Sequence, residues 1–209
     1  MKTKCLIISG GNYEKVNMSV EDCFVIACDK GLAYAELDGI VPDLVIGDFD
    51  SYGCCPNFDG EMITLPAQKD DTDTMFAVKE AVKRGFEEII ITSALGGRMD
   101  HLYANYQAMM YAITRNVKAR IVSQDMMIIG LHSGMSLVEK VDPGQIVSVF
   151  SYSDFCSGVT IKGTFYDVTK VDLTNDFPLG QSNYANSTEI EVSVEIGKLI
   201  VMILREIHE

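Results

Sequence analysis

The sequence predicts an α/β fold: an N-terminal Rossmann-like, mostly parallel sheet with helices on both faces, followed by a C-terminal antiparallel β-sandwich. Up to about residue 123, short and continuously apolar runs alternate with runs of helical period, which is typical of a parallel sheet buried on both faces. After about residue 125, apolar and polar residues alternate with period two, which indicates antiparallel strands. We therefore expect one domain over residues 1–123 and a second over residues 124–209.

The N-terminal domain is expected to alternate strands with helices. Met75, Val78 and Val82 recur at helical spacing and predict a helix over residues 72–84, and a second long helix is expected over residues 100–116. Strand, helix and strand in this order imply right-handed βαβ units. The expected strands are residues 4–8, 24–28, 44–46, 61–65, 88–92 and 118–123.

The C-terminal domain is expected to contain strands only. Residues 189–196 alternate Ile and Val with Glu and Ser, which predicts a strand with one buried face. Gly197 and Lys198 interrupt this pattern before the apolar residues 199–204, so we expect a hairpin here. Residues 124–133 are expected to join the two domains. Further short strands are expected over residues 145–151, 158–161 and 164–169.

Charge and cysteine content argue against several kinds of partner. The 209 residues include 17 Lys and Arg against 30 Asp and Glu, a formal net charge of −13. Nucleic acid and anionic membrane surfaces are therefore not expected as partners, because both attract basic proteins. The apolar run over residues 199–204 is far shorter than the ~20 residues that span a bilayer. The six cysteines form no Cys-x-x-Cys pair and no cluster with zinc spacing. Cys5, Cys23 and Cys28 lie in or beside apolar runs, where a free thiol behaves as a small hydrophobe, so a reducing cytoplasm is expected.

Acidic residues gather where segments of the N-terminal domain end or begin. Asp29 follows one expected strand, Asp48 and Asp50 follow the next, and Asp73 lies at a helix start. From residue 43 to residue 73 there are eight acidic residues and one basic residue, Lys69. Crowded carboxylates repel one another unless a cation lies between them, and Mg²⁺ combines oxygen ligands with substrate phosphates. The alternative is that these aspartates cap turns and helix starts.

A glycine-rich segment follows the strand expected over residues 88–92. Gly96 and Gly97 allow close approach of the backbone to a ligand, and the next helix offers unpaired amides to an anion. Arg98 is able to bind phosphate with two hydrogen bonds, whereas Asp100 and His101 have the alternative role of capping the helix. A second glycine loop, residues 9–12, lacks nucleotide-binding spacing and is interpreted as a turn. The residues alone thus predict a Mg²⁺ site for a phosphorylated ligand, with group transfer and hydrolysis both open.

These motifs resemble, in order and spacing, those of the thiamine pyrophosphokinase family. The resemblance covers nearly the whole chain. It implies transfer of the pyrophosphoryl group of ATP to the hydroxyl of thiamine, giving thiamine diphosphate and AMP, by a Mg²⁺-dependent homodimer with active sites between subunits. The motifs that carry it are Asp29, Gly47-Asp48-Phe49-Asp50-Ser51, Lys69-Asp70-Asp71-Thr72-Asp73, Gly96-Gly97-Arg98-Met99-Asp100-His101 with Asn105, and Ser182-Asn183.

The resemblance also implies roles for individual residues. Residues 1–123 are similar to a nucleotide-binding catalytic domain, and residues 124–209 to a domain for thiamine binding and dimerisation. The chain has no Trp, so Tyr184 or Phe177 would have to stack on thiamine. The catalytic and metal residues implied are Asp48, Asp50 and Asp73; the ATP-binding residues are Lys69, Thr72, Gly96, Gly97, Arg98, Asp100 and His101; the thiamine-binding residues are Asp29, Ser182 and Asn183.

Two rival functions follow from the same residues. Asp48-x-Asp50 is also compatible with a Mg²⁺-dependent phosphotransferase or phosphohydrolase acting on a different small molecule. The second rival is a module that binds the magnesium complex of ATP without turnover. The identity of the nucleotide product distinguishes all three.

Overall fold

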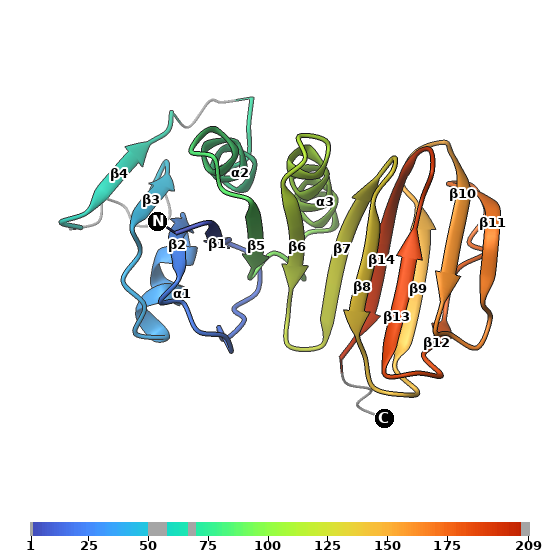
Figure 1. Cartoon of the computed structure of the whole chain (residues 1–209). Coiled ribbons are helices and arrows are strands. Elements are labelled where there is room, and N and C mark those ends of the chain that lie inside the picture. Colours follow the sequence, from blue (N-terminus) through green and yellow to red (C-terminus); the bar gives the residue numbers. More distant parts are fainter. Residues whose placement is uncertain (1, 50–57, 67–69, 206–209) are drawn as a thin grey trace. The chain divides into compact units, whose positions relative to one another are not determined.

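The computed structural model describes residues 2–49, 58–66 and 70–205 (Figure 1). The chain divides into two compact units, residues 1–123 and 124–209. None of the described helices has the length and hydropathy required to cross a membrane.

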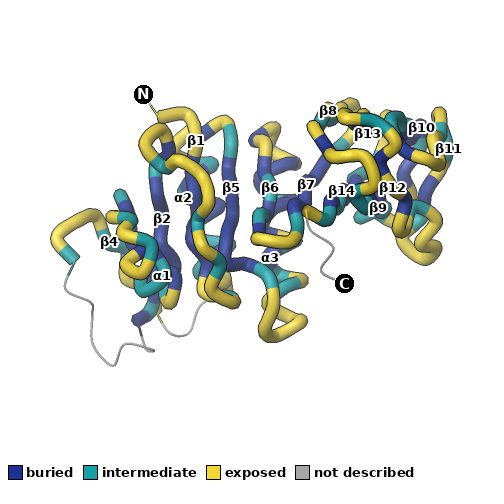
Figure 2. The backbone as a smooth tube through the Cα atoms, turned by 90° about the horizontal axis from the view of Figure 1, so that it is seen from below, coloured by how far each residue is buried: buried dark blue, intermediate teal, exposed yellow. Residues whose placement is uncertain are grey.

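The N-terminal unit contains a parallel sheet in the order β6-β5-β1-β2-β3-β4. Its central strands are buried on both faces, and Figure 2 shows β2 and β5 mostly in the colour of buried residues. All these strands run in the same direction, so the residues that follow them gather at one edge of the sheet. The strands are β1 (Lys4–Ile8), β2 (Cys23–Cys28), β3 (Leu44–Gly47), β4 (Glu61–Thr64), β5 (Glu88–Thr92) and β6 (Lys118–Val122).

The helices of this unit are α1 (Gly31–Leu37), α2 (Asp73–Lys83) and α3 (Met99–Ile113). Ala35 of α1 packs with Leu6 of β1 and Val25 of β2, which project from one face of the sheet. The start of α2 instead contacts Cys28, whose side chain projects from the opposite face, since its Sγ atom lies 3.8 Å from the Asp73 carbonyl oxygen. Helices therefore cover both faces of the sheet, as predicted, although α1 was not predicted.

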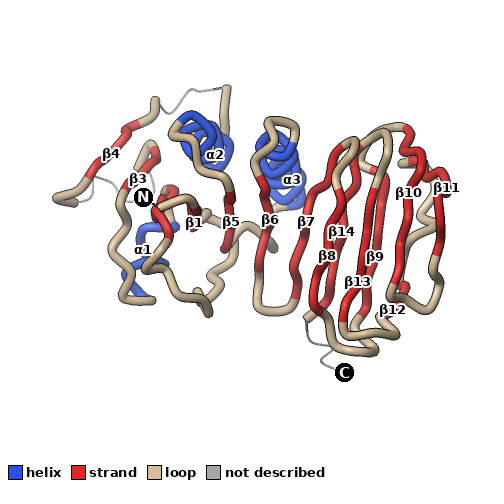
Figure 3. The backbone as a smooth tube through the Cα atoms, viewed as in Figure 1, coloured by secondary structure: helices blue, strands red, loops and turns tan. Residues whose placement is uncertain are grey.

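The C-terminal unit contains two antiparallel sheets and no helix in its described residues, 124–205 (Figure 3). One sheet has the order β12-β9-β14-β7 within this unit, and the other has the order β11-β10-β13-β8. The strands are β7 (Met126–His132), β8 (Ser136–Lys140), β9 (Ile146–Ser151), β10 (Phe155–Lys162), β11 (Val168–Thr174), β12 (Asn183–Tyr184), β13 (Glu189–Ser193) and β14 (Lys198–Leu204).

The predicted hairpin at Gly197 and Lys198 is wrong. Strand β13 pairs with β8 and β10, whereas β14 pairs with β7 and β9, so the two consecutive strands belong to different sheets. Gly197 has a φ of 111°, and a side chain at this position would lie 2.6 Å from Sγ of Cys156 and 2.7 Å from the Phe155 carbonyl. This glycine therefore allows the chain to cross from one sheet to the other, rather than to turn back on itself.

Two further predictions of this unit need correction. Residues 124–133 do not form a linker, because most of them build β7, which is buried along five of its seven residues. The strand expected over residues 164–169 is also misplaced. Residues 163–167 form the connection between β10 and β11, and the strand itself begins at Val168.

Candidate active site

The carboxyl edge of the parallel sheet brings Asp29 and Asp48 to neighbouring strand ends. Asp29 directly follows β2, and its backbone N–H donates to the Ile46 carbonyl at 2.9 Å. A Cβ added to Gly47 would lie 3.3 Å from the backbone N and Cα of Asp29. Glycine at position 47 therefore allows the end of β3, and with it Asp48, to approach Asp29 closely. Oδ1 of Asp29 is fully enclosed, and Asp48 is half-buried.

Three strand ends at this edge carry a non-glycine residue in the left-handed region. The φ angles are 47° for Asp29 after β2, 56° for Phe49 after β3 and 52° for Ser93 after β5. Such conformations are unfavourable for non-glycine residues and persist only where the surroundings fix them. Phe49 is fixed by burial of its ring against Leu32 and Val45. Asp48, the residue before Phe49, thus leaves the end of β3 in a defined direction.

Asp73 is the first residue of α2. It lies at the same carboxyl edge, on the face of the sheet opposite to the one that α1 covers. Its carbonyl oxygen accepts from Sγ of Cys28, the residue before Asp29. Thr72, predicted to bind ATP, caps α2: its Oγ1 accepts from the Met75 N–H at 3.1 Å. Asp71 is neutralised by Lys79, whose Nζ lies 2.7 Å from its carboxylate. Asp73 is therefore the acidic residue of this segment that the fold brings to the strand ends.

The donor chemistry of Asp29, Asp48 and Asp73 fits a hard cation, because Mg²⁺ prefers carboxylate oxygen and keeps several waters. Within residues 2–49, 58–66 and 70–205, no three acidic, His or Cys side chains are grouped closely enough to hold a metal ion. The predicted ligand Asp50 and the predicted ATP contact Lys69 lie outside the described residues. The described carboxylates thus supply suitable donors for part of a magnesium site.

Gly96 and Gly97 form an exposed bend between β5 and α3, with φ angles of 77° and 68°. Arg98 follows this bend and binds Asp100, with an Nη2 to Oδ2 distance of 2.6 Å. These hydrogen bonds hold the pKa of the Asp100 carboxyl below its usual value and raise the pKa of Arg98. Asp100 also accepts from the His101 N–H at 3.0 Å, so it satisfies one amide in the first turn of α3, although the N-cap residue, Arg98, makes no side-chain capping bond. A phosphate bound by Arg98 would replace Asp100 as its partner.

Helix α3 is anchored to the end of β5 by a buried amide. Nδ2 of Asn105 donates to the Ala94 carbonyl at 2.7 Å. Asn105 is only 7% exposed, so its hydrogen bond is shielded from water. This contact fixes the position of the first turns of α3 relative to the Gly96–Gly97 bend. Asn105 is thus a structural residue of the nucleotide motif that the resemblance included.

The glycine loop of residues 9–12, interpreted from sequence as a turn, lies along the same edge. The N–H of Gly11 donates to the Ser93 carbonyl at 2.7 Å, and the N–H of Asn12 donates to the Leu95 carbonyl at 3.2 Å. A Cβ on Gly96 would collide with Nδ2 of Asn12. The sequence did not reveal the contact of Asn12 with Gly96, because these two residues lie more than eighty positions apart in the chain.

In the C-terminal unit, Ser182 and Asn183 differ in exposure. Ser182 is exposed and has a φ of 54°, and its N–H donates to Oγ of Ser148 at 2.9 Å. Asn183 is buried. Its Nδ2 donates to Oγ1 of Thr164 and to the Tyr166 carbonyl, each at 3.0 Å, and its Oδ1 accepts from the Tyr166 N–H at 3.1 Å. The amide of Asn183 thus holds the β10–β11 connection in place.

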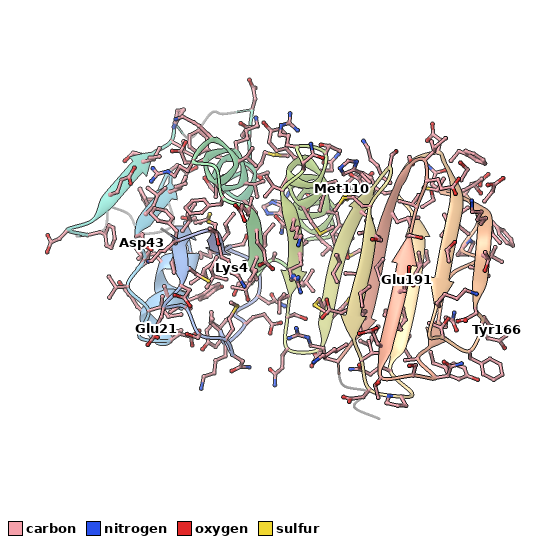
Figure 4. The ribbon with its side chains drawn as sticks, in the orientation of Figure 1. Lys4, Glu21, Asp43, Met110, Tyr166 and Glu191 are labelled. Atoms are coloured by element: carbon pink, nitrogen blue, oxygen red, sulfur yellow. The ribbon has the colours of Figure 1, made fainter. Side chains whose placement is uncertain are left out.

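Exposed aromatic rings gather here: Phe165 and Tyr166 lie on that connection, and Tyr184 lies on β12. Phe165 and Tyr184 are stacked, with ring centroids 4.9 Å apart, and Phe165 and Tyr166 meet edge to face at the same distance. All three are at least 39% exposed, and Figure 4 labels Tyr166 where β10 and β11 are joined. Phe177, the other predicted stacking residue, is exposed and has no ring partner within the described chain. Tyr184 is therefore the candidate that belongs to an ordered ring surface.

Comparison with known proteins identifies the family. The family model for the thiamin pyrophosphokinase catalytic domain matches residues 17–122. The chain belongs to the thiamin pyrophosphokinase family. This match includes Asp29, Asp48, Asp73 and the segment from Gly96 to His101, whereas residues 9–12 lie outside it.

Relatives in the thiamin pyrophosphokinase family are similar to this protein over most of its chain. The thiamine pyrophosphokinase of Bacillus subtilis is 28% identical over 182 residues, which cover 85% of each chain. The crystal structure of thiamine pyrophosphokinase from Bacillus subtilis covers 98% of this chain and all of its own, with a TM-score of 0.84 at 23% identity.

A bacterial and a fungal structure share the same fold. The family protein from Enterococcus faecalis has a TM-score of 0.82 at 24% identity, over 98% of this chain and 100% of its own. Thiamin pyrophosphokinase from Candida albicans has a TM-score of 0.76 at 14% identity, over 98% and 90%. Membership of the family makes the protein an enzyme of the transferase class.

Proposed function

We propose that the protein transfers the pyrophosphoryl group of ATP to the hydroxyl of thiamine. The observation that carries this proposal is the family match over residues 17–122, which contains the acidic strand ends and the glycine bend of one sheet edge. In the reaction, the hydroxyl oxygen of thiamine bonds to the β-phosphorus of ATP. The bond from that phosphorus to the oxygen shared with the α-phosphorus breaks, and AMP leaves. The hydroxyl proton passes to a carboxylate or to water.

The chain's own residues would act mainly by position and charge. Phosphoryl transfer needs alignment and charge stabilisation rather than a strong nucleophile. Arg98 would exchange Asp100 for a phosphate oxygen, and Lys69 would add a second cation. Asp73, whose backbone carbonyl lies beside the end of β2, would orient the acceptor hydroxyl or accept its proton.

Mg²⁺ is part of this proposal, with Asp48, Asp50 and Asp73 as its ligands. Bound there, the ion would neutralise phosphate charge in a protein that already carries a net charge of −13. The backbone of Asp29 lies close to Gly47, the residue before Asp48. The proposal assigns Asp29 to the thiamine side of the site, as the resemblance implies.

The C-terminal unit would supply the thiamine contacts. Thiamine carries a cationic ring and a second aromatic ring, and both suit an exposed tyrosine face. Tyr184, supported by the stacked ring of Phe165, provides such a face, and Ser182 offers an exposed hydroxyl beside it. In this proposal, the N-terminal unit is a Rossmann-like nucleotide-binding domain. The C-terminal unit is a β-sandwich for thiamine binding and dimerisation.

A homodimer in the cytoplasm, with active sites between subunits, completes the proposal. Sedimentation of the purified protein tests the dimer. A monomer at all concentrations that retains full activity would contradict the shared site.

The deciding experiment incubates purified protein with ATP, Mg²⁺ and thiamine, omits each in turn, and identifies the nucleotide product. We expect AMP, formed only when all three are present. ADP would instead indicate a kinase that transfers one phosphoryl group. Inorganic phosphate released without thiamine would indicate a phosphohydrolase, and unchanged ATP would indicate a binding module.

A further inference from the structure

We infer that the loop of residues 9–12 forms part of the phosphate-binding site for ATP, with the Asn12 amide and Lys30 as contacts. This inference rests on the proposed use of ATP. It adds a segment that lies outside the residues matched by the family model.

The loop touches three segments of this edge, those next to the Gly96–Gly97 bend, to Asp73 and to Asp29. Its backbone bonds to Ser93 and Leu95, just before the Gly96–Gly97 bend. Oγ of Ser9 lies 2.6 Å from Oγ1 of Thr74, the residue after Asp73. On a third side, a Cβ added to Gly10 would lie 3.7 Å from Cβ of Lys30, the residue after Asp29. The loop is therefore central to the carboxyl edge of the sheet.

One glycine of this loop, Gly11, is required by a close backbone contact. A Cβ on Gly11 would lie 2.6 Å from the Ser93 carbonyl oxygen, a distance that real side chains do not adopt. The Gly11 carbonyl also accepts from the hydroxyl of Tyr34 in α1 at 2.9 Å. The backbone of the loop is thus fixed on both sides, so the direction in which Asn12 leaves it is fixed as well.

Asn12 offers an available donor beside the glycine bend. Its side chain is exposed and packs directly against Gly96, with Oδ1 3.8 Å from the position of a Cβ on Gly97. Within the described part of the chain the Asn12 amide makes no hydrogen bond. A phosphate that approaches the amides of this bend would come within reach of the Asn12 NH₂ group. The carboxylates of this edge repel an anion, whereas the neutral Asn12 donor and the Lys30 ammonium attract one.

The substitution Asn12→Asp tests this role. Aspartate has the shape of asparagine but carries a negative charge in place of the NH₂ donor. If Asn12 donates to phosphate, we expect the dissociation constant for ATP, measured calorimetrically with Mg²⁺ and without thiamine, to rise at least about tenfold. The KM for ATP is expected to rise with it while the KM for thiamine stays unchanged. Asn12→Ala should weaken ATP binding less than Asn12→Asp.

Matched variants separate a contact from a purely structural role. Asn17→Asp introduces the same change at an exposed position of the following segment and should leave ATP binding unchanged. Lys30→Gln should weaken ATP binding and reduce its dependence on salt, whereas Lys15→Gln, at another exposed lysine, should not. Unfolding temperatures of all variants should stay close to that of the unsubstituted protein.

The outcomes distinguish this inference from the proposed function. Unchanged ATP affinity in Asn12→Asp would overturn the inference and leave the proposed function intact. If the unsubstituted protein binds ATP but forms no thiamine diphosphate, the proposed function fails and the Asn12 result still decides the inference. If it does not bind ATP at all, both are overturned.

Discussion

The two units position their candidate site residues by different means. At the carboxyl edge of the N-terminal sheet, Asp29 and Asp48 are brought together by backbone contacts, above all the close approach of Gly47. In the C-terminal unit, the exposed rings of Tyr166 and Tyr184 are held by a side chain, the buried amide of Asn183. We therefore expect charge changes in the first unit to affect catalysis with little loss of stability. Changes at Asn183 should affect stability and thiamine binding together.

The largest effect is expected for Asp48→Asn, which preserves shape and removes charge. Loss of one electrostatic contact to the reacting groups typically costs about 10²–10³ in kcat, or about 2.7–4 kcal/mol. We expect at least this loss, with an unfolding temperature close to that of the unsubstituted protein. Asp142→Asn, at an exposed position of the other unit, is the control and should retain full activity. Full turnover by Asp48→Asn would show that Asp48 is not part of the active site.

Asn183→Ala tests the other half of the comparison, the C-terminal unit. The substitution leaves the buried Thr164 hydroxyl and the backbone of Tyr166 without their hydrogen bonds to Asn183, so we expect a loss of about 1–3 kcal/mol in the free energy of unfolding. Urea denaturation measures this loss. The KM for thiamine should rise and the KM for ATP should not. Asn175→Ala, which removes only an exposed hydrogen bond to Asp154, is the control. A change in KM without a change in stability would instead make Asn183 a direct thiamine contact.

Gly47→Ala tests whether the backbone sets the spacing of the carboxylates. The added Cβ would lie 3.2 Å from Cε1 of Phe49 and 3.3 Å from the backbone of Asp29, which has little room to move. We expect about 1–3 kcal/mol of destabilisation together with a lower kcat. Gly39→Ala is a control for added side-chain bulk, because nothing lies near the Cβ position there, although its φ of 67° contributes strain of its own. Unchanged kcat in Gly47→Ala would show that the spacing is set elsewhere.

The smallest effect is expected at the ring surface. Tyr184→Ala removes one exposed aromatic face, and an exposed cation–π contact contributes about 0.5–1 kcal/mol. The KM for thiamine should therefore rise about two- to fivefold, with kcat nearly unchanged. Tyr184→Phe keeps the ring stacked on Phe165 and should behave like the unsubstituted protein. A rise in KM with Tyr184→Phe as well would assign the effect to the hydroxyl rather than to the ring.

The sequence predicts the regular parts of the fold well, because burial on both faces leaves a simple pattern. Strands over residues 4–8 and 88–92 have the predicted bounds, and α2 differs from its prediction by one residue at each end. Helix α1 was missed because it has only seven residues and begins with Gly31. The hairpin at Gly197 was wrong because a glycine that crosses between sheets and one that turns a hairpin look alike in sequence.

The sequence predicts those residues of the candidate site that directly follow strands. Asp29 and Asp48 lie after consecutive strands of a parallel sheet, and the sequence alone indicates this. The capping role of Thr72 and the buried hydrogen bonds of Asn183 were not predictable, because a polar residue looks the same whether it faces a ligand or the backbone. The contact of Asn12 with Gly96 depends on the pairing of β1 with β5, which no local pattern reveals.

The place of β1 between β2 and β5 has a consequence for synthesis on the ribosome. The partner of one edge of β1, strand β2, is complete at Cys28, but the partner of its other edge, β5, is complete only at Thr92. An open edge of an apolar strand is prone to join other chains. The nascent protein therefore passes through a stage in which more than eighty residues are complete and its first strand is still half unpaired, and a chaperone that shields β1 would act in that interval.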